Sequence, residues 1–172
     1  MSRAFVKESD EDAAAGELPE RPVPAHPNYV TARGLAQLQE RERALAVRHE
    51  QLKSVAEDDS SAKQKLREVD RDLRYLRAQL ERAEPVQATA GLGEEAPDVR
   101  FGAEVVIEDE AGKQQCYRIV GDDEADAAAG DISWASPLAR ALLGARVGDV
   151  VTWRRPAGSV DIEVTGIRYD RA

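Results

Sequence analysis

The sequence is poor in the residues that build disulfide frameworks, metal centres and large aromatic cores. It has one cysteine, Cys116, which can form no disulfide within the chain, and two histidines. Aromatic residues make up 5% of the 172 positions and charged residues 33%, which argues against one large hydrophobic core. No apolar run approaches the ~18–20 residues of a membrane span, and the N-terminus has no apolar signal region. We therefore expect a cytoplasmic protein with no membrane contact.

Charge is distributed unevenly along the chain. The net charge is −9, yet residues 31–84 hold 12 basic and 11 acidic side chains. Three of those acidic side chains are consecutive, Glu57, Asp58 and Asp59, and without them the segment is basic. Proteins that bind free nucleic acid usually present a broad basic patch, and this sequence has none. We therefore expect contact with DNA only indirectly, through another protein.

A heptad repeat organises the chain between residues 62 and 83. Its apolar residues recur at alternating steps of four and three, which is the a/d pattern of a coiled-coil helix and requires a partner helix. Ser61 with Gln64 fits a capping box at the start of this helix, and Pro85 ends it. The seam residues are Ala62, Leu66, Val69, Leu73, Leu76, Leu80 and Ala83.

A second helical pattern over residues 31–56, with Thr31 as its N-cap, supplies the partner. The positions that complete its seam are either Glu42 and His49, or Arg41 and Arg48 one face over. A histidine on such a seam is far more often a packing residue than a metal ligand, and we assign none to it. The apolar residues of the inner face are Leu35, Leu38, Leu45 and Leu52.

Only Glu57-Asp58-Asp59-Ser60 separates the two patterns, which leaves room for a tight reversal alone. Two helices joined in this way lie antiparallel, as a hairpin. With 22 to 26 residues each, they would form a finger roughly 35–40 Å long. The three consecutive carboxylates lie at its free end. Carboxylates beside a helix N-terminus also oppose the helix dipole, so they have a structural explanation as well as a functional one.

Changes in composition predict four segments. Residues 1–28 form a flexible tail that is acidic and rich in proline, and that cannot bury enough apolar surface to order itself. Residues 29–84 form the coiled-coil finger, and residues 85–98 form a linker. Residues 99–172 form a second, small domain.

The second domain shows the two-residue alternation of β-strands. A half-buried strand begins at Val99, a hairpin turn lies at residues 109–112, and an acidic loop spans residues 122–131. Pro137 sits in the first turn of a short helix, with Ser136 before it as the cap. The whole chain is therefore predicted to be α+β, with a helical hairpin followed by a small antiparallel sheet domain that contains one short helix.

Six runs of residues in the C-terminal half carry a family resemblance. They are Ile119-Val120-Gly121, Glu124-Ala125-Asp126, Ile132-Ser133, Ser136-Pro137-Leu138-Ala139-Arg140-Ala141-Leu142-Leu143-Gly144, Val147-Gly148-Asp149-Val150 and Pro156-Ala157-Gly158. These runs resemble the C-terminal domain of the bacterial transcription elongation factors GreA and GreB. In the finger, Val30-Thr31-x-x-Gly34-Leu35 and Lys65-Leu66-Arg67-Glu68-Val69-Asp70-Arg71 are also similar to this family, so the resemblance covers about residues 28–170.

The resemblance implies an FKBP-like domain that docks on RNA polymerase at the rim of its secondary channel. The docking residues would be Ser136, Pro137, Leu138 and Arg140, on an exposed cap and turn. The coiled coil would enter the channel as a monomer and meet the 3′ end of the nascent RNA. The protein would be an accessory factor acting in trans and not itself an enzyme. It would have no cofactor and no metal of its own.

The resemblance also implies chemistry for the three carboxylates. Asp58 and Asp59, supported by Glu57, would help hold a Mg²⁺ ion of the polymerase active site while backtracked RNA is cut. Mg²⁺ prefers oxygen ligands, often one or two carboxylates plus phosphate. Phosphodiester hydrolysis of this kind uses two metal ions.

Three alternatives stay open, the first because the tip departs from the family pattern and the others because of the FKBP-like domain and the heptad seam. The family sequence Gly-Asp-x-Ser-Glu-Asn-Ala-(Asp/Glu)-Tyr is replaced here by residues 55–61, and each helix is shorter by about one heptad, or ~10 Å. A channel-binding regulator that does not stimulate cleavage is therefore the first alternative. An FKBP-like prolyl isomerase and a coiled-coil assembly protein are the others.

Overall fold

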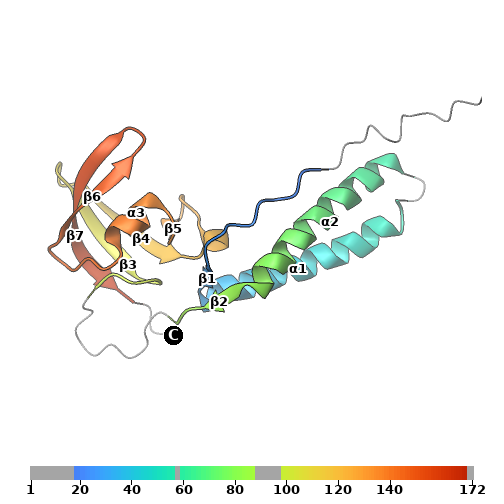
Figure 1. Ribbon diagram of the computed structural model, residues 1–172, viewed down its shortest axis with the longest axis horizontal. Coiled ribbons are helices and arrows are strands. Elements are labelled where there is room, and N and C mark those ends of the chain that lie inside the picture. The colour runs from blue at the N-terminus through green and yellow to red at the C-terminus, as the bar shows by residue number, and fades with distance from the viewer. Residues whose placement is uncertain (1–17, 57–58, 88–97, 170–172) are drawn as a thin grey trace, which may run out of the picture.

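The computed structural model describes residues 18–56, 59–87 and 98–169, and shows a long helical finger joined to a sheet domain (Figure 1). The predicted α+β architecture is confirmed. None of the helices in these ranges is both long and apolar enough to cross a membrane. The elements are β1 (Asn28–Val30), α1 (Ala32–Lys53), α2 (Ser60–Glu81), β2 (Ala83–Pro85), β3 (Glu104–Asp109), β4 (Gln114–Val120), the 3-10 helix η1 (Asp122–Glu124), β5 (Asp131–Ser133), α3 (Pro137–Leu142), β6 (Val150–Arg155) and β7 (Gly158–Arg168).

Helices α1 and α2 form the predicted antiparallel hairpin (Figure 1). Each has 22 residues, so the paired part is about 33 Å long. Six of the seven predicted seam residues lie in α2 and are buried or half-buried. The seventh, Ala83, is half-buried in β2, because α2 ends at Glu81, before the predicted stop at Pro85. On α1, Glu42 and His49 complete the seam, because they are half-buried whereas Arg41 and Arg48 are exposed. The seam of α2 is thus filled by α1 of the same chain, and the described helices present no unpaired seam to a second chain.

The ends of the two helices follow capping chemistry. Thr31 is the N-cap of α1, as predicted, and its hydroxyl accepts a hydrogen bond from Gly34 N at 3.0 Å. The predicted cap of α2, Ser61, is wrong. Asp59 holds that place, because its carboxylate accepts from Ser61 N at 2.8 Å and starts the helix two residues earlier. Helix α1 ends at Lys53, and the next three residues form a turn.

A short parallel pair, β1 and β2, ties the two ends of the finger together. Asn28 pairs with Ala83 and Val30 with Pro85, so the chain leaves the finger beside the point where it entered. Asn28 is 4% exposed, and its side-chain amide donates to Gln79 O at 2.9 Å. The base of the finger is therefore closed.

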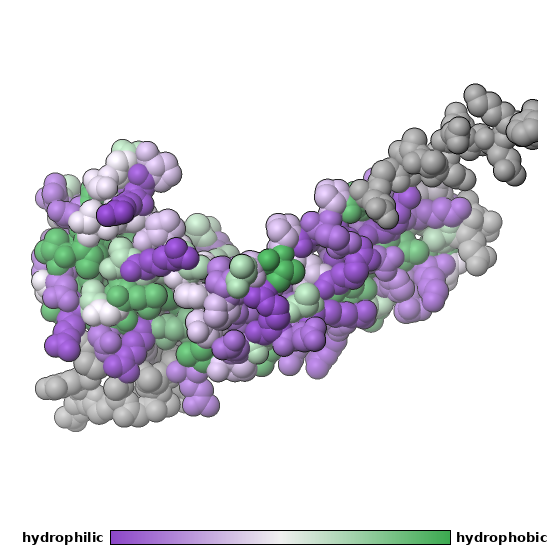
Figure 2. Space-filling view, in the orientation of Figure 1, coloured by the Kyte–Doolittle hydropathy of each residue, from purple (hydrophilic) through white to green (hydrophobic). Residues whose placement is uncertain are grey.

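The sheet of the C-terminal domain has the strand order β5-β4-β3-β7-β6. Its neighbouring strands are antiparallel, as predicted, except for β4 and β5, which run parallel. Helix α3 packs on this sheet and closes a core separate from the two apolar clusters of the finger. In Figure 2 the visible face of the finger is mostly hydrophilic, and apolar residues gather more densely over the sheet domain.

The strand predicted from Val99 begins later, at Glu104. Val99 is buried, but its N–H donates to Ala145 O instead of joining the sheet. Gly102 has φ of 84°, a left-handed conformation that interrupts an extended strand. The predicted segment boundaries stay predictions, and residues 1–17 and 88–97, in the tail and the linker, lie outside the described residues.

Candidate functional site

The turn of the finger is the first part of the candidate site. Two of its three predicted carboxylates, Glu57 and Asp58, lie outside the described residues. The third, Asp59, is exposed, and one of its two carboxylate oxygens accepts the hydrogen bond from Ser61 N that caps α2. Among the described residues nothing donates to the other oxygen, which Asp59 can therefore offer to a cation.

The turn is fixed from below by apolar contacts. Ala56 is 6% exposed and packs with Leu52 and Ala62, one from each helix. Val55 beside it is 54% exposed. The last described turn of the finger is therefore packed on one side and exposes an apolar side chain on the other. Within the described ranges no three His, Cys, Asp or Glu side chains gather as a metal site.

The predicted docking segment lies at the start of α3. The Ser136 hydroxyl accepts from Ala139 N at 3.2 Å, which caps the helix as predicted, and Pro137 occupies its first turn. Pro137 and Arg140 are exposed. The expected exposure of Leu138 is wrong: it is 4% exposed and belongs to the core of the sheet domain.

Helical geometry explains why Leu138 turns inward. Leu138 and Leu142 are four residues apart and so share one face of α3, with Ala139 beside them. All three are buried against the sheet. The accessible part of the predicted docking segment is therefore Ser136, Pro137 and Arg140.

The finger meets the sheet domain at η1, which we call the interdomain turn (Asp122–Glu124). The Glu124 side chain is 2% exposed. Its carboxylate accepts from Thr31 N at 3.1 Å and from the Thr31 hydroxyl at 2.5 Å. Asp123 accepts from Tyr75 Oη at 3.0 Å and from Gln79 Nε2 at 2.7 Å. Adjacent carboxylates thus bind α1 and α2.

This junction was missed in the sequence, where residues 122–131 were assigned only as an acidic loop. The available signal was the acidic run Asp122-Asp123-Glu124 after Gly121, but a second run of the same kind, Glu108-Asp109-Glu110, leads into the β3–β4 turn. Nothing in the sequence identifies Thr31 as its partner, because the two segments are 93 residues apart.

Burial and charge alter proton affinity at the junction. Partial burial, followed by the charge of Asp123, raises the pKa of Tyr75 to about 12. The hydrogen bond that Arg33 donates to Asp131, at 2.7 Å, raises the pKa of Arg33. Both groups therefore keep their protons throughout the physiological pH range.

Aromatic side chains gather at the same junction. Tyr29 lies with its ring centroid 4.9 Å from that of Trp134 and 6.2 Å from that of Phe101. Trp134 also meets the edge of His26 at 5.2 Å. These rings pack β1 and the residues just before it against the sheet domain.

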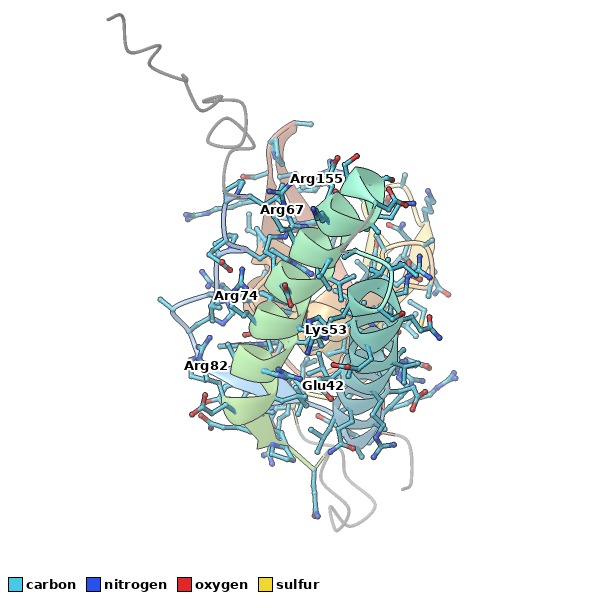
Figure 3. The ribbon with its side chains drawn as sticks, turned by 90° about the vertical axis from the view of Figure 1, so that its right-hand side faces the viewer. Glu42, Lys53, Arg67, Arg74, Arg82 and Arg155 are labelled. Atoms are coloured by element: carbon cyan, nitrogen blue, oxygen red, sulfur yellow. The ribbon has the colours of Figure 1, made fainter. Side chains whose placement is uncertain are left out.

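The basic residues of α2 lie along the finger. Arg67, Arg74 and Arg82 are spaced along one side of this helix from the tip toward the base (Figure 3). Arg74 binds Glu20, with an N–O distance of 2.5 Å, and Arg82 donates to His26 O at 2.6 Å. Arg74 and Arg82 are thus engaged by residues 18–27, whereas Arg67, nearer the tip, is exposed and has no hydrogen bond or ion pair within the described ranges.

The chain is similar to known proteins over its C-terminal part and beyond it. The family profile "Transcription elongation factor, GreA/GreB, C-term" matches residues 94–169. Transcription elongation factor GreB of Neisseria meningitidis serogroup B is 43% identical over 107 residues, which are 62% of this chain and 64% of that protein. GreB of Pasteurella multocida is 40% identical over 109 residues, 63% of this chain and 67% of that protein. The chain belongs to the GreA/GreB family.

The GreA/GreB match is uneven along the chain. The family profile covers the sheet domain and includes α3, whereas α1 and α2 lie outside it. The chain spans a little under two thirds of the Neisseria GreB. A crystal structure of GreA factor homolog 1 (Gfh1) of Thermus thermophilus aligns at 26% identity over 83% of this chain and 99% of that chain, with a TM-score of 0.38. The resemblance predicted from the sequence is therefore confirmed at the level of the family.

Proposed function

We propose that this member of the GreA/GreB family binds bacterial RNA polymerase through its sheet domain and places its finger in the secondary channel. There the acidic tip stimulates cleavage of backtracked RNA. The observation that carries the proposal is a closed antiparallel finger of two 22-residue helices that projects from a GreA/GreB domain (Figure 1).

Packing between its two helices makes the finger rigid along its length. Buried leucines fill its middle, with Leu73 and Leu76 at 4% and 5% exposure. Polar contacts between the helices add to this packing: Arg77 Nε lies 2.9 Å from Glu42 Oε1, and His49 Nε2 lies 2.9 Å from Asp70 Oδ1. A hairpin packed in this way keeps its tip at a fixed distance from its base, about 33 Å.

The donor groups at the tip fit a hard cation. The second carboxylate oxygen of Asp59 is the kind of ligand that Mg²⁺ prefers, and Asp58 and Glu57 would add two more carboxylates. A Mg²⁺ ion of the polymerase would supply charge stabilisation to phosphodiester hydrolysis. The role of this chain would be to bring oxygen ligands to that ion, while Arg67 near the tip would attract the RNA phosphates.

The cleavage experiment compares the parent protein with Asp58→Asn/Asp59→Asn on one backtracked elongation complex. Because ligation needs the negative charge, we expect the double variant to lose at least about tenfold in stimulated cleavage while its affinity for polymerase is unchanged. The stability of helix α2 should fall by only about 1–2 kcal/mol. The favourable interaction of two carboxylates with the helix dipole is lost, but asparagine still serves as a good N-cap. The matched control is Glu110→Gln, which removes one exposed carboxylate from the β3–β4 turn.

The outcomes distinguish the proposal from its competitor. Equal stimulation by parent and variant would reject these carboxylates. No stimulation by either protein, together with slower transcription, would identify a channel-binding regulator without cleavage activity. One observation favours the regulator without cleavage activity. One carboxylate oxygen of Asp59 accepts the hydrogen bond that caps α2, so this residue has a structural role that needs no metal.

A further inference from the structure

The three carboxylates of the interdomain turn are divided among three separate segments of the N-terminal half. Asp122 Oδ2 lies 3.2 Å from His26 Nε2, in residues 18–27 before the finger. Asp123 takes hydrogen bonds from α2, and Glu124 takes them from the start of α1. The three carboxylates of the turn thus contact three different segments of the N-terminal half.

The turn itself is held firmly by the sheet domain. The Ser133 hydroxyl, at the end of β5, donates to Asp122 Oδ1. Gly121, directly before the turn, is buried, and a side chain there would come within 2.5 Å of Tyr29 O. The three carboxylates are therefore held in fixed positions relative to the sheet domain, and the segments that bind them are held there as well.

Glu124 makes the most constrained of these contacts. Four donors of the described residues surround its two oxygens: Thr31 N, the Thr31 hydroxyl, Gly121 N at 3.3 Å and Arg33 Nε at 3.6 Å. Thr31 accepts in turn from Gly34 N, so the carboxylate extends the N-cap of α1 into the other domain. A Cβ on Gly34 would lie 2.1 Å from Glu124 Cδ, so only glycine admits the carboxyl group here.

We propose that Glu124 is a positioning residue that fixes the direction of the finger relative to the sheet domain, with Asp123 fixing the second helix. The functional part of this inference rests on the proposed function, since direction matters only if the tip must reach a site on polymerase. A tip about 33 Å from the junction moves several ångströms for a rotation of about 10° at its base, which is enough to misplace a metal ligand.

The first test measures direction in the isolated full-length chain, without polymerase. Spin labels at Val55→Cys and Val147→Cys, in a Cys116→Ser background, report the distance between the finger tip and the sheet domain. Both positions are exposed, at 54% and 58%. We expect one narrow distance distribution for the parent and a width that roughly doubles in Glu124→Gln, because an amide NH₂ cannot accept from donors.

Gly34→Ala is the second variant, because it displaces the Glu124 carboxyl group while favouring helix formation in α1. Gln37→Ala, an exposed change one turn later, and Glu110→Gln are the matched controls. Parent-like distributions in both Glu124→Gln and Gly34→Ala would overturn the proposal. Loss of the fold of either domain, seen by circular dichroism in both variants, would also overturn it, because a positioning contact leaves each domain folded.

The second test separates affinity from effect on polymerase. We expect the concentration of Glu124→Gln for half-maximal effect to stay within about twofold of the parent, and the maximal effect to fall about fivefold. A weaker affinity with an unchanged maximum would contradict a positioning role. If the parent protein has no effect on polymerase, the proposed function fails, while the distance measurement still decides whether Glu124 orients the finger.

Discussion

Tyr75 shows how one residue at the junction couples packing to charge. Its ring lies under the guanidinium of Arg21, 3.9 Å away, and its hydroxyl donates to Asp123. Burial raises the pKa of the hydroxyl first and the charge of Asp123 adds to it, up to about 12. The proton of Tyr75 is thus part of the contact between α2 and the interdomain turn.

This raised pKa predicts a loss of stability at alkaline pH. A tyrosine in the unfolded chain ionises near pH 10, so between pH 10 and about 12 the unfolded state releases a proton that the folded state keeps. The free energy of unfolding therefore falls as pH rises through this window, by about 1–2 kcal/mol after allowance for partial solvent exposure. The stabilisation is complete below pH 10.

Urea unfolding of the parent and of Tyr75→Phe at pH 9, 10, 11 and 12 tests this expectation. The variant should be less stable by about 1 kcal/mol at pH 9, because a hydrogen bond is lost, but should lose less stability toward pH 12. Parallel pH dependences for the two proteins would exclude Tyr75 as the titrating group.

For single residues, the sequence correctly predicted the features that depend only on neighbouring residues. Thr31 and Ser136 are caps because a hydroxyl beside a helix start can accept a backbone N–H, which needs no knowledge of the rest of the fold. Leu138 was misassigned because its burial depends on where the sheet lies. Asp59 competed with Ser61 for the same helix end, and both residue types suit that position.

The finger is the element whose sequence and structure agree most closely. The heptad spacing of α2 specifies one buried face, and the structure covers that face with α1. The agreement has a physical reason: a seam of period 3.5 is a property of the helix itself, whatever its partner is. The choice between Glu42 with His49 and Arg41 with Arg48 needed the structure, since both pairs occur at the right spacing.

Leu73→Ala tests the energetic weight of this seam. The side chain is 4% exposed between the helices, so the free energy of unfolding of the finger should fall by about 2–4 kcal/mol. Val47→Ala on α1 is the control, because Val47 is 60% exposed and its change should cost under about 0.5 kcal/mol. The measurement is amide hydrogen exchange in each element.

The same hydrogen-exchange measurement tests whether the core of the finger and the core of the sheet domain unfold independently. Amides of α1 and α2 should exchange faster in Leu73→Ala, while those of β3 and β7 keep their protection, because the apolar clusters of the finger and of the sheet domain are separate. Equal acceleration throughout the chain would show that the protein unfolds as one unit.

Across the whole molecule, the proposed binding surface and the proposed acting surface lie on different parts. Pro137 and Arg140 are exposed on α3 of the sheet domain, and Asp59 lies at the turn of the finger. Such a division predicts that affinity and effect can be changed separately. The junction between the parts could not be predicted, because it joins residues far apart in the sequence through tertiary placement alone.

Pro137→Glu/Arg140→Glu tests the binding surface in the full chain. Glutamate suits the first turn of a helix, and neither side chain is in the core, so the domain should stay folded. We expect affinity for RNA polymerase to fall at least about tenfold, with the maximal effect restored at saturating protein. Arg154→Glu, an exposed charge reversal on β6, is the matched control.

A loss in the control as large as that in the double variant would indicate a general charge effect and reject α3 as the binding surface. Leu138→Glu is unsuitable as a test of binding. It places a charge in the core, so it should unfold the sheet domain whether or not α3 binds polymerase.

The parallel pairing of β1 with β2 limits how the reach of such a finger can change. Both ends of the hairpin are held side by side, so residues added to one helix alone would displace every seam contact between the insertion and the turn. Only matched insertions or deletions of a whole heptad in both helices preserve the seam, and each pair changes the length by about 10 Å. The length of the finger can therefore change only in steps of about 10 Å. One such step is larger than the displacement that a ligand of a metal ion can tolerate.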